Sequence, residues 1–347
     1  MRHTYSLTDR ERMILRLVVN RFVGTGDPVG SRSLSRFYDI GLSPASIRNT
    51  MSDLEDGGYL GHPHTSSGRV PTDFGYRAYV DELMDVESLS RKERSLLSEG
   101  VSQAPPEILE LMHESARILG QMSNLLGVAL SPRFATAVFR RLDIVPVTST
   151  RAMFVVTVES GLAKTLILEV EGEIESEQIA SVVALLNERL SGLTFREIRN
   201  TAAERVRGTD DADLDLVSFV LKRASVIFSD PPERRRMAYS GAGFILSQPE
   251  FSETDRVRHI IEFLESGEAV VSTLEEAQND DDEGRIVIRI GSENTADDLS
   301  EYSVVAARYS LGQVTGSIGL IGPTRMNYGR AVGLVEGMAA AISRYFV

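Results

Sequence analysis

The sequence predicts an α+β fold that begins with a small, mainly helical unit. Within the first 84 residues, three capped helices are followed by a hairpin pattern and a fourth helix. Beyond them, strands occur in two blocks separated by a mainly helical stretch, which favours one α+β domain with a helical piece inserted into it. The length of 347 residues agrees, because it corresponds to two or three domains of ordinary size.

Side-chain caps and glycines mark the elements of the N-terminal unit. Thr8 and Glu11 form a capping box, and apolar residues at helical spacing continue until Gly24–Gly26. The later elements follow from similar signals: Ser31 caps a short helix through Phe37, Ser43-Pro44 starts a helix that ends at Gly57-Gly58, Tyr59–Pro63 and Arg69–Pro71 form a two-stranded hairpin, and Thr72 caps a helix to about Met84.

The rest of the chain alternates between helical and strand patterns. A charged helix and a break at Gln103–Pro106 precede a long helix to about Gly127, whose apolar side includes Leu126. Strands are predicted near residues 138–145, 152–158 and 164–169, and again near 286–290, 303–310 and 316–321. Helices are predicted at 177–190, 214–228, 254–264 and 327–345.

The order of helix, turn, helix and hairpin in the N-terminal unit is typical of a winged helix-turn-helix, whose second helix of the motif enters the major groove of DNA. In the helix that starts at Ser43, Ile47, Met51 and Leu54 share one face and should point to the core. Ala45, Arg48, Asn49 and Ser52 then face outward. Arginine can bind guanine and asparagine can bind adenine through paired hydrogen bonds, so this face suits base edges.

Acidic residues restrict how this helix can approach DNA. Asp53, Glu55 and Asp56 would be repelled by phosphates, so the N-terminal half of the helix should enter the groove. The hairpin offers phosphate donors, or side chains that reach into the minor groove, at His62, His64, Thr65, Ser66, Ser67 and Arg69. For any one helix residue taken alone, a solvated helix face is the better explanation, and a solvated turn is the alternative for the hairpin; only the combination with the caps and the hairpin favours DNA.

The charge distribution is compatible with DNA binding at one end of the chain. The net charge is −13, but residues 1–80 carry ten basic and eight acidic side chains, so that segment is +2 and the remainder is −15. No cysteine is present, which excludes disulfides and thiolate metal sites and fits a reducing cytoplasm. The N-terminus lacks the apolar stretch of a signal peptide, and no apolar run approaches a membrane span, so we expect no membrane association.

The sequence offers little for an enzyme, a metal or a bound nucleotide. His62 and His64 lack a third ligand at recognisable spacing. The glycines between Gly312 and Gly322 surround a predicted hairpin and lack a following Lys-Ser/Thr, and Asp280–Glu283 is most simply a solvated loop. We therefore expect no catalytic residues, no metal and no cofactor.

Several long motifs resemble the heat-inducible transcription repressor family HrcA: TGDPVGSRSL (Thr25–Leu34), SPASIRNTMSDLEDGGYL (Ser43–Leu60), PHTSSGRVPTDFGYRAYVDELM (Pro63–Met84), SQPEF (Ser247–Phe251) and GPTRMNY (Gly322–Tyr328). The resemblance spans the whole chain. Departures are small: Asn327 stands where an acidic residue is expected, and Gly241–Phe244 is less typical.

The resemblance implies three domains and a function. The domains are a winged helix-turn-helix at 1–88, a GAF-like domain at 105–172 and 236–347, and an inserted dimerisation domain at 173–235. The implied function is repression of chaperone operons of the groE and dnaK type through an inverted-repeat operator called CIRCE. Activity would be maintained by the GroEL chaperonin and lost on heat stress, in the cytoplasm and on the nucleoid when bound.

The resemblance also assigns site residues. Arg48 and Asn49 become the base-reading positions, with Ser46 and Ser52 beside them and Ser43 at the start of the helix. Ser31, Arg32, His64 and Arg69 become phosphate or wing contacts.

An inverted repeat requires a two-fold protein, so we expect a homodimer. One apolar stripe is a candidate interface: Leu214, Val217, Leu221, Ala224 and Phe228. Packing of this stripe within its own domain is an equally good interpretation of the pattern. A second functional alternative is a repressor gated by a small molecule bound in the GAF-like domain.

Overall fold

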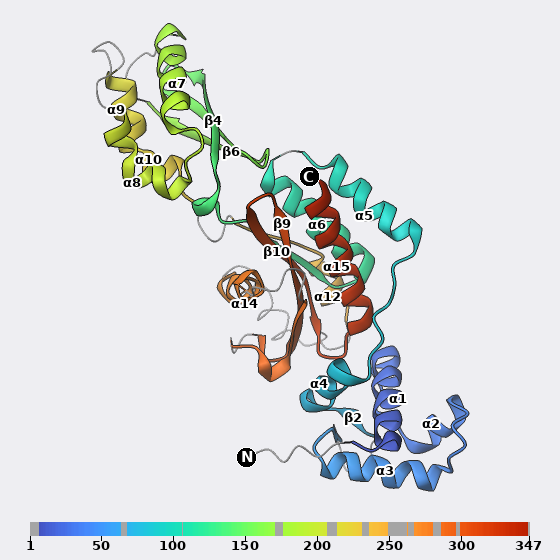
Figure 1. Ribbon diagram of the computed structural model, residues 1–347. Coiled ribbons are helices and arrows are strands. Elements are labelled where there is room, and N and C mark those ends of the chain that lie inside the picture. The colour runs from blue at the N-terminus through green and yellow to red at the C-terminus, as the bar shows by residue number, and fades with distance from the viewer. Residues whose placement is uncertain are drawn as a thin grey trace.

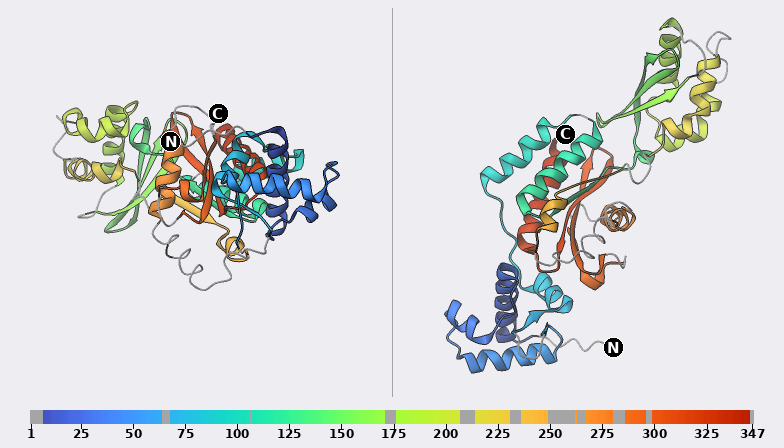
Figure 2. Two further views of the ribbon diagram at one scale, coloured as in Figure 1. Left: turned by 90° about the horizontal axis from the view of Figure 1, so that it is seen from below. Right: turned by 180° about the vertical axis from the view of Figure 1, so that it is seen from behind.

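The computed structural model describes residues 7–63, 68–105, 107–170, 176–206, 214–230, 236–248, 262, 267–279, 286–295 and 299–345. The chain forms three lobes arranged in a row (Figure 1). A small head, residues 7–84, lies at one end, a five-stranded sheet with its helices forms the middle lobe, and residues 134–230 form an outer lobe at the other end (Figure 2). The prediction of an α+β fold is confirmed.

The head contains the predicted helices and hairpin. Its elements are α1 (Asp9–Thr25), α2 (Ser31–Phe37), α3 (Pro44–Asp56), β1 (Leu60–Gly61), β2 (Val70–Pro71) and α4 (Asp73–Glu82). The Thr8–Glu11 capping box is present, and Gly26 ends α1 in the left-handed conformation that glycine adopts without strain. The prediction that Ser31 caps α2 is wrong, because Gly30 takes the extended N-cap conformation and Ser31 is already the first helical residue.

The middle lobe is built on an antiparallel sheet with strand order β7-β3-β10-β9-β8. The strands are β3 (Leu126–Leu130), β7 (Met237–Ser240), β8 (Ile286–Ile290), β9 (Tyr302–Leu311) and β10 (Val314–Pro323). Helices α6 (Ile108–Ser123) and α15 (Tyr328–Tyr345) cover one face, and α5 (Arg91–Gln103) packs against both of them (Figure 1). On the other face lies α14 (Glu268–Asn279), and a short α12 (Ala242–Leu246) follows β7.

One predicted helix runs past its true end. The sequence extended the helix before Gly127 through Leu126, but Asn124 adopts the left-handed conformation (φ 55°) and ends α6 at Ser123. Leu126 is therefore the first residue of β3, where it is completely buried against the α14 side of the sheet. A short apolar stretch after an amphipathic helix continues the apolar pattern, so periodicity alone does not separate the two elements.

The outer lobe is a separate three-stranded antiparallel sheet with helices on one face. The strands β4 (Phe139–Thr148), β5 (Arg151–Val158) and β6 (Ala163–Glu169) pair in sequence order. The helices are α7 (Ser176–Leu190), α8 (Phe195–Arg205), α9 (Leu214–Lys222) and α10 (Ala224–Ile227). Between sheet and helices, the ring of Phe228 packs edge-on against those of Phe139 and Phe195, and all three side chains are fully buried.

The sheet pairing corrects the predicted assignment of these strands. The GAF-like segment 105–172 included them, whereas β4, β5 and β6 form a sheet of their own beside α7–α10. The strand patterns are local, but the choice of pairing partner depends on contacts distant in sequence. The predicted boundary at residue 173 therefore lies inside the outer lobe.

The other predicted elements divide into three groups. The strands near 286–290, 303–310 and 316–321 and the closing helix are confirmed as β8, β9, β10 and α15. The predicted helix 214–228 is interrupted at Arg223, and α8 was not predicted. Of the predicted helix 254–264, all but residue 262 lies outside the described residues.

A buried lysine ties the sheet of the outer lobe to its last helix. Lys164 of β6 donates hydrogen bonds to the backbone oxygens of Val226, Ile227 and Ser229, at 3.0, 3.2 and 2.6 Å. Burial lowers the pKa of Lys164 to about 8. These bonds satisfy carbonyl groups at and just beyond the end of α10 that have no helical partner.

In the described residues, no helix is long and apolar enough to cross a membrane.

Candidate nucleic-acid interface

Helix α3 has one buried and one open face, as the sequence predicts. The hydroxyl of Ser43 accepts a hydrogen bond from the Ser46 amide (3.2 Å), and Pro44 occupies the first turn, so the start of the helix is fixed. The core face, Ile47, Met51 and Leu54, is at most 4% exposed and packs against α1 and α2. The outward face is exposed in full: Ala45, Arg48, Asn49 and Ser52.

Arg48 and Asn49 are available to an incoming ligand. Both side chains are exposed, and neither makes a hydrogen bond or an ion pair within the described part of the chain. An arginine and an asparagine next to each other on an open helix can bind guanine and adenine, respectively, through two hydrogen bonds each. Figure 1 places α3 at the end of the head that points away from the middle lobe.

A neighbouring arginine, which the sequence analysis did not single out, lies at the start of α3. The guanidinium of Arg10, on α1, donates to the backbone oxygen of Ser46 at 2.9 Å and to the Ser46 hydroxyl. Ser46, predicted to stand beside the base-reading residues, is thus half-buried and already engaged within the head. Arg10 brings a positive charge to the N-terminal end of α3, and no local pattern marks it, because the contact spans 36 positions of sequence.

The α2 side of the interface carries two exposed arginines. Arg32 and Arg36 are exposed on α2, whereas Ser31 is half-buried. Nearby, the Arg21 guanidinium lies 3.8 Å from the centre of the Phe37 ring, and that ring is 59% exposed. Arg32 thus remains accessible where a phosphate contact was predicted, and Arg36 adds a second cation on the same short helix.

The hairpin is held against α3 through a shared carboxylate. One oxygen of Glu55 forms an ion pair with Arg69 at 2.6 Å, and the other contacts Nδ1 of His62. Arg69 also bridges Val29 through two backbone hydrogen bonds of 2.8 Å. Arg69, predicted as a phosphate or wing contact, is therefore engaged with the C-terminal end of α3. His64 and the rest of the hairpin tip lie outside the described residues.

A close approach of backbones fixes α4 beneath this hairpin. A Cβ atom at Gly75 would lie 2.0 Å from the backbone oxygen of Tyr59, so only glycine fits at this position of α4. The Thr72 hydroxyl caps α4 and donates to the Gly58 oxygen at 2.7 Å. The hairpin and α4 therefore form one unit, which contacts the C-terminal end of α3.

Comparisons with known proteins place the chain in a family. The family model described as "HrcA protein C terminal domain" matches residues 109–332. A heat-inducible transcription repressor HrcA of Chlorobium phaeobacteroides (strain BS1) is 39% identical over 352 aligned positions, which cover 98% of each chain. The chain belongs to the HrcA family. The relatives that match it over nearly their whole length are named heat-inducible transcription repressors.

A second relative and one solved structure extend the comparison of this HrcA-family chain. The heat-inducible transcription repressor HrcA of Chlorobaculum parvum is 40% identical, and the alignment covers 97% of each chain. A crystal structure described only as that of a hypothetical protein has a TM-score of 0.64 and 22% identity, covering 98% of this chain and 99% of that one. At this identity the likeness shows the fold alone.

The stripe predicted for dimerisation lies largely inside the outer lobe of this HrcA-family chain. Val217 and Ala224 are 3% and 7% exposed, and Phe228 is completely buried against other aromatic rings. Leu221 is half-buried, and the side chain of Leu214 is outside the described set. For the three buried residues, the structure agrees with packing inside the lobe.

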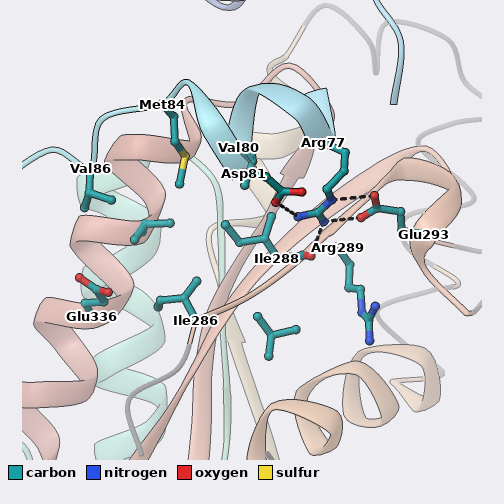
Figure 3. Close-up of a pocket in the computed structure, with 12 residues that line it drawn as sticks. Arg77, Val80, Asp81, Met84, Val86, Ile286, Ile288, Arg289, Glu293 and Glu336 are labelled. Carbon is teal, nitrogen blue, oxygen red and sulfur yellow. Dashed lines mark hydrogen bonds and ion pairs between the residues drawn. The ribbon is translucent and has the colours of Figure 1, made fainter. Parts of the chain in front are cut away.

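A groove of about 630 Å³ separates the head from the middle lobe (Figure 3). Its apolar side chains come from α4, β8, α15 and the linker after α4, and include Val80, Met84 and Ile286. Charged groups lie at its margins, among them Arg77, Asp81 and Glu293. Residues of the head and of the middle lobe both line the groove, so a ligand bound there would contact both lobes.

In the described residues, no group of three His, Cys, Asp or Glu side chains is arranged to hold a metal ion. His62 contacts the carboxylate of Glu55, which is its ion-pair partner if the ring is protonated.

Proposed function

We propose that this chain represses transcription by reading an operator with the outward face of α3, as the recognition helix of a winged helix-turn-helix. The observation that carries the proposal is that Arg48 and Asn49 stand exposed, with no hydrogen bond or ion pair to any described residue, on a helix whose opposite face is anchored in the core. Arg10, Arg32 and Arg36 then supply phosphate contacts around it.

The acidic end of α3 supports this orientation. Asp53 and Asp56 are exposed near its C-terminal end, whereas the cations of the surface gather near its N-terminal end and on α2. Phosphates repel the carboxylates at the C-terminal end of the helix. The N-terminus of a helix carries a partial positive charge, which attracts phosphates. The first half of α3 is therefore the part that enters the groove.

We propose further that the protein acts as a homodimer on an inverted repeat. The resemblance to the family supports a CIRCE-type operator in front of chaperone operons of the groE and dnaK type. Such an operator is an inverted repeat, and each half-site needs an identically oriented head, which a homodimer supplies. In this proposal the middle lobe is the GAF-like domain, and the outer lobe, residues 134–230, is the inserted dimerisation domain.

The open face of the outer sheet supports dimerisation there. Val145 pairs with Met153, and Met153 pairs with Ile167, so three apolar side chains form a row across β4, β5 and β6. Val145 and Ile167 are 44% and 60% exposed, while α7–α10 cover the opposite face. A second copy related by a two-fold axis would cover this row with its own, as expected for an exposed apolar face in a homodimer.

The dimer surface is tested by charged substitutions. Ile167→Asp should give a monomer by light scattering at micromolar concentration, because the carboxylate would be buried in the interface. Val226→Asp is the matched control, since Val226 is 42% exposed on α10, away from the open face. Leu221→Asp tests the predicted stripe. If the Ile167→Asp variant is still a dimer, or if the Val226→Asp variant is a monomer, the interface does not lie on the open face of this sheet.

DNA binding is tested by gel shift at stated salt. The full-length protein is titrated against a duplex with an inverted repeat and against a scrambled duplex of equal composition, because electrostatic affinity alone does not distinguish them. A folded dimer that binds both duplexes equally would contradict the proposed function.

Dependence on a GroEL-type chaperonin is a proposal drawn from the family. The active fold would be marginally stable, so that heat-damaged proteins compete for the chaperonin and leave the repressor inactive. Operator occupancy is measured after heating, with and without purified chaperonin. Equal occupancy in both samples would exclude this control.

The second candidate is a repressor gated by a small molecule. The groove of about 630 Å³ between α4 and the middle lobe favours it, because a bound ligand would contact the head directly. A thermal-shift screen of metabolites separates the two proposals, since a tight, saturable hit without chaperonin would support the ligand.

A further inference from the structure

The head is joined to the middle lobe through a cluster of polar contacts on α4. Arg77 Nε donates to Glu293 Oε1 at 2.8 Å, and its Nη2 donates to the other carboxylate oxygen and to the Ile288 backbone oxygen, the latter at 2.7 Å. Its Nη1 binds Asp81 at 3.0 Å. Figure 3 shows the guanidinium of Arg77 between the two carboxylates, at the end of β8. All three guanidinium nitrogens are thus engaged.

A second carboxylate of α4 reaches the same segment. Asp73 accepts hydrogen bonds from both the amide and the hydroxyl of Ser292, each at 2.9 Å. Arg77 and Asp73 lie four positions apart on α4 and bind positions 288–293 together. This gives a two-point attachment, and an attachment of this kind fixes rotation as well as distance.

The linker after α4 provides an independent line of contact along α15. The Glu87 amide donates to the Gly329 oxygen at 3.1 Å. A Cβ atom at Gly329 would lie 2.4 Å from the Asp85 oxygen, and one at Gly333 would lie 2.3 Å from the Glu87 oxygen. The linker therefore runs directly on the backbone of α15. The head cannot turn relative to the middle lobe without breaking either this contact or the one made by Arg77.

The joint lies on the opposite side of the head from α3 (Figure 1, and Figure 2 at right). A side chain there does not touch DNA, but α4 carries the hairpin through the contact at Gly75 and so sets the direction in which α3 points. In a dimer that reads an inverted repeat, the direction of the two reading helices determines which half-site separation fits both at once.

We propose that Arg77 is a positioning residue that sets the half-site spacing the dimer accepts. It acts through the orientation of the head and makes no contact with the operator. The proposal rests on the proposed function, namely a two-fold repressor that reads inverted repeats. Lysine cannot replace the planar fork that binds Glu293 through two nitrogens and still reaches Ile288.

The experiment measures affinity as a function of spacing. An inverted repeat is selected from random DNA by the wild-type protein, and its half-sites are then moved apart or together by 1, 2 and 5 base pairs. Arg77→Ala and Arg77→Lys are compared with wild type on this series and on a single half-site. Asp73→Asn tests the second attachment, and circular dichroism confirms that each variant is folded.

Arg117→Ala is the matched control. Arg117 forms an equally bidentate pair with Glu114, but both residues lie on α6 and do not touch the head. The control should keep the wild-type spacing profile and affinity.

We expect wild type to prefer one spacing by at least ten-fold. In Arg77→Ala the preference should fall to about two-fold or less, while binding to a single half-site stays within two-fold of wild type. A folded Arg77→Ala with the wild-type spacing profile overturns the proposal, as does an equal loss on the single half-site. A wild-type protein that ignores spacing but still prefers the repeat over scrambled DNA refutes only this inference, whereas failure to prefer the repeat refutes the proposed function.

Discussion

Replacing Arg48 by alanine separates base reading from general attraction to DNA. Arg48 is exposed and has no partner within the described residues, so its removal breaks no contact of the folded chain. The unfolding free energy should therefore change by no more than about 0.5 kcal/mol. If the guanidinium forks onto a guanine, each half-site loses about 1 to 3 kcal/mol, which is a factor of roughly 5 to 140 in affinity.

The assay titrates Arg48→Ala against the operator and against a random duplex at several salt concentrations. Affinity of the dimer for the operator should fall by this factor once for each of the two half-sites, whereas affinity for the random duplex falls much less. On the operator the dependence on salt should stay nearly unchanged, because a base contact releases no phosphate counterion. Arg94→Ala removes the same charge from an exposed site on α5 and should leave both affinities unchanged.

Two results would refute this reasoning. An equal loss on both duplexes, together with a salt slope shallower by about 1 per head, would make Arg48 a phosphate anchor. No loss on either duplex would show that α3 presents another face to DNA.

Three further predictions follow from contacts elsewhere in the chain. Glu55→Gln frees Arg69 from its ion pair, so binding to random DNA should strengthen and its salt slope should steepen by about 1 per head, as measured by titration; an unchanged slope would mean that Arg69 stays on the hairpin. Lys164→Met removes the lysine hydrogen bonds to carbonyl oxygens at and just beyond the end of α10 and should destabilise the outer lobe by about 1 to 3 kcal/mol in urea unfolding, unlike the exposed control Lys222→Met. Burial raises the pKa of Glu293, but the hydrogen bonds and charge from Arg77 together outweigh burial, so this pKa lies below its ordinary value. The stabilising contribution of the Glu293 carboxylate is thus fully present above the pKa of 4.5 in the unfolded chain and is lost as pH falls below that value. Hydrogen exchange in α4 should therefore accelerate below this pH. Glu293→Gln should remove this pH dependence of the exchange rate.

The sequence predicted the head well because its signals are local. The caps at Thr8, Ser43 and Thr72 each bond to an amide three residues away, and a contact of that range can be read directly from the sequence. The faces of α3 followed from helical spacing alone. The predicted cap at Ser31 was wrong because the N-cap is Gly30, and glycine at an N-cap has no side chain that would mark it in the sequence.

The organisation of the larger part could not be predicted in the same way. Strands β4, β5 and β6 were located correctly, but nothing local reveals that they form one three-stranded sheet with each other. Helix α8 was missed although it carries a capping box, Thr194 with Glu197, which a search for that motif would have found. The engagement of Arg69 by Glu55 was also not predicted, because a charged residue in a hairpin does not reveal its partner.

Several arginines of the head are held in ion pairs, which limits how steeply the affinity for DNA can depend on salt concentration. Arg12, Arg16, Arg69 and Arg77 are all held in ion pairs. Among the described arginines on α3 and beside it, Arg10, Arg32, Arg36 and Arg48 form none.

If Arg48 reads bases, three cations per head remain for phosphates, or six per dimer. The slope of log affinity against log salt should then be about −5. Titration of wild type from 50 to 300 mM salt measures it. A slope near −9 or steeper would require the paired arginines to leave their carboxylates for DNA, and the interface would then extend well beyond α3. A slope near −2 would mean that the acidic body, −15 outside the first 80 residues, keeps most of the head away from the backbone.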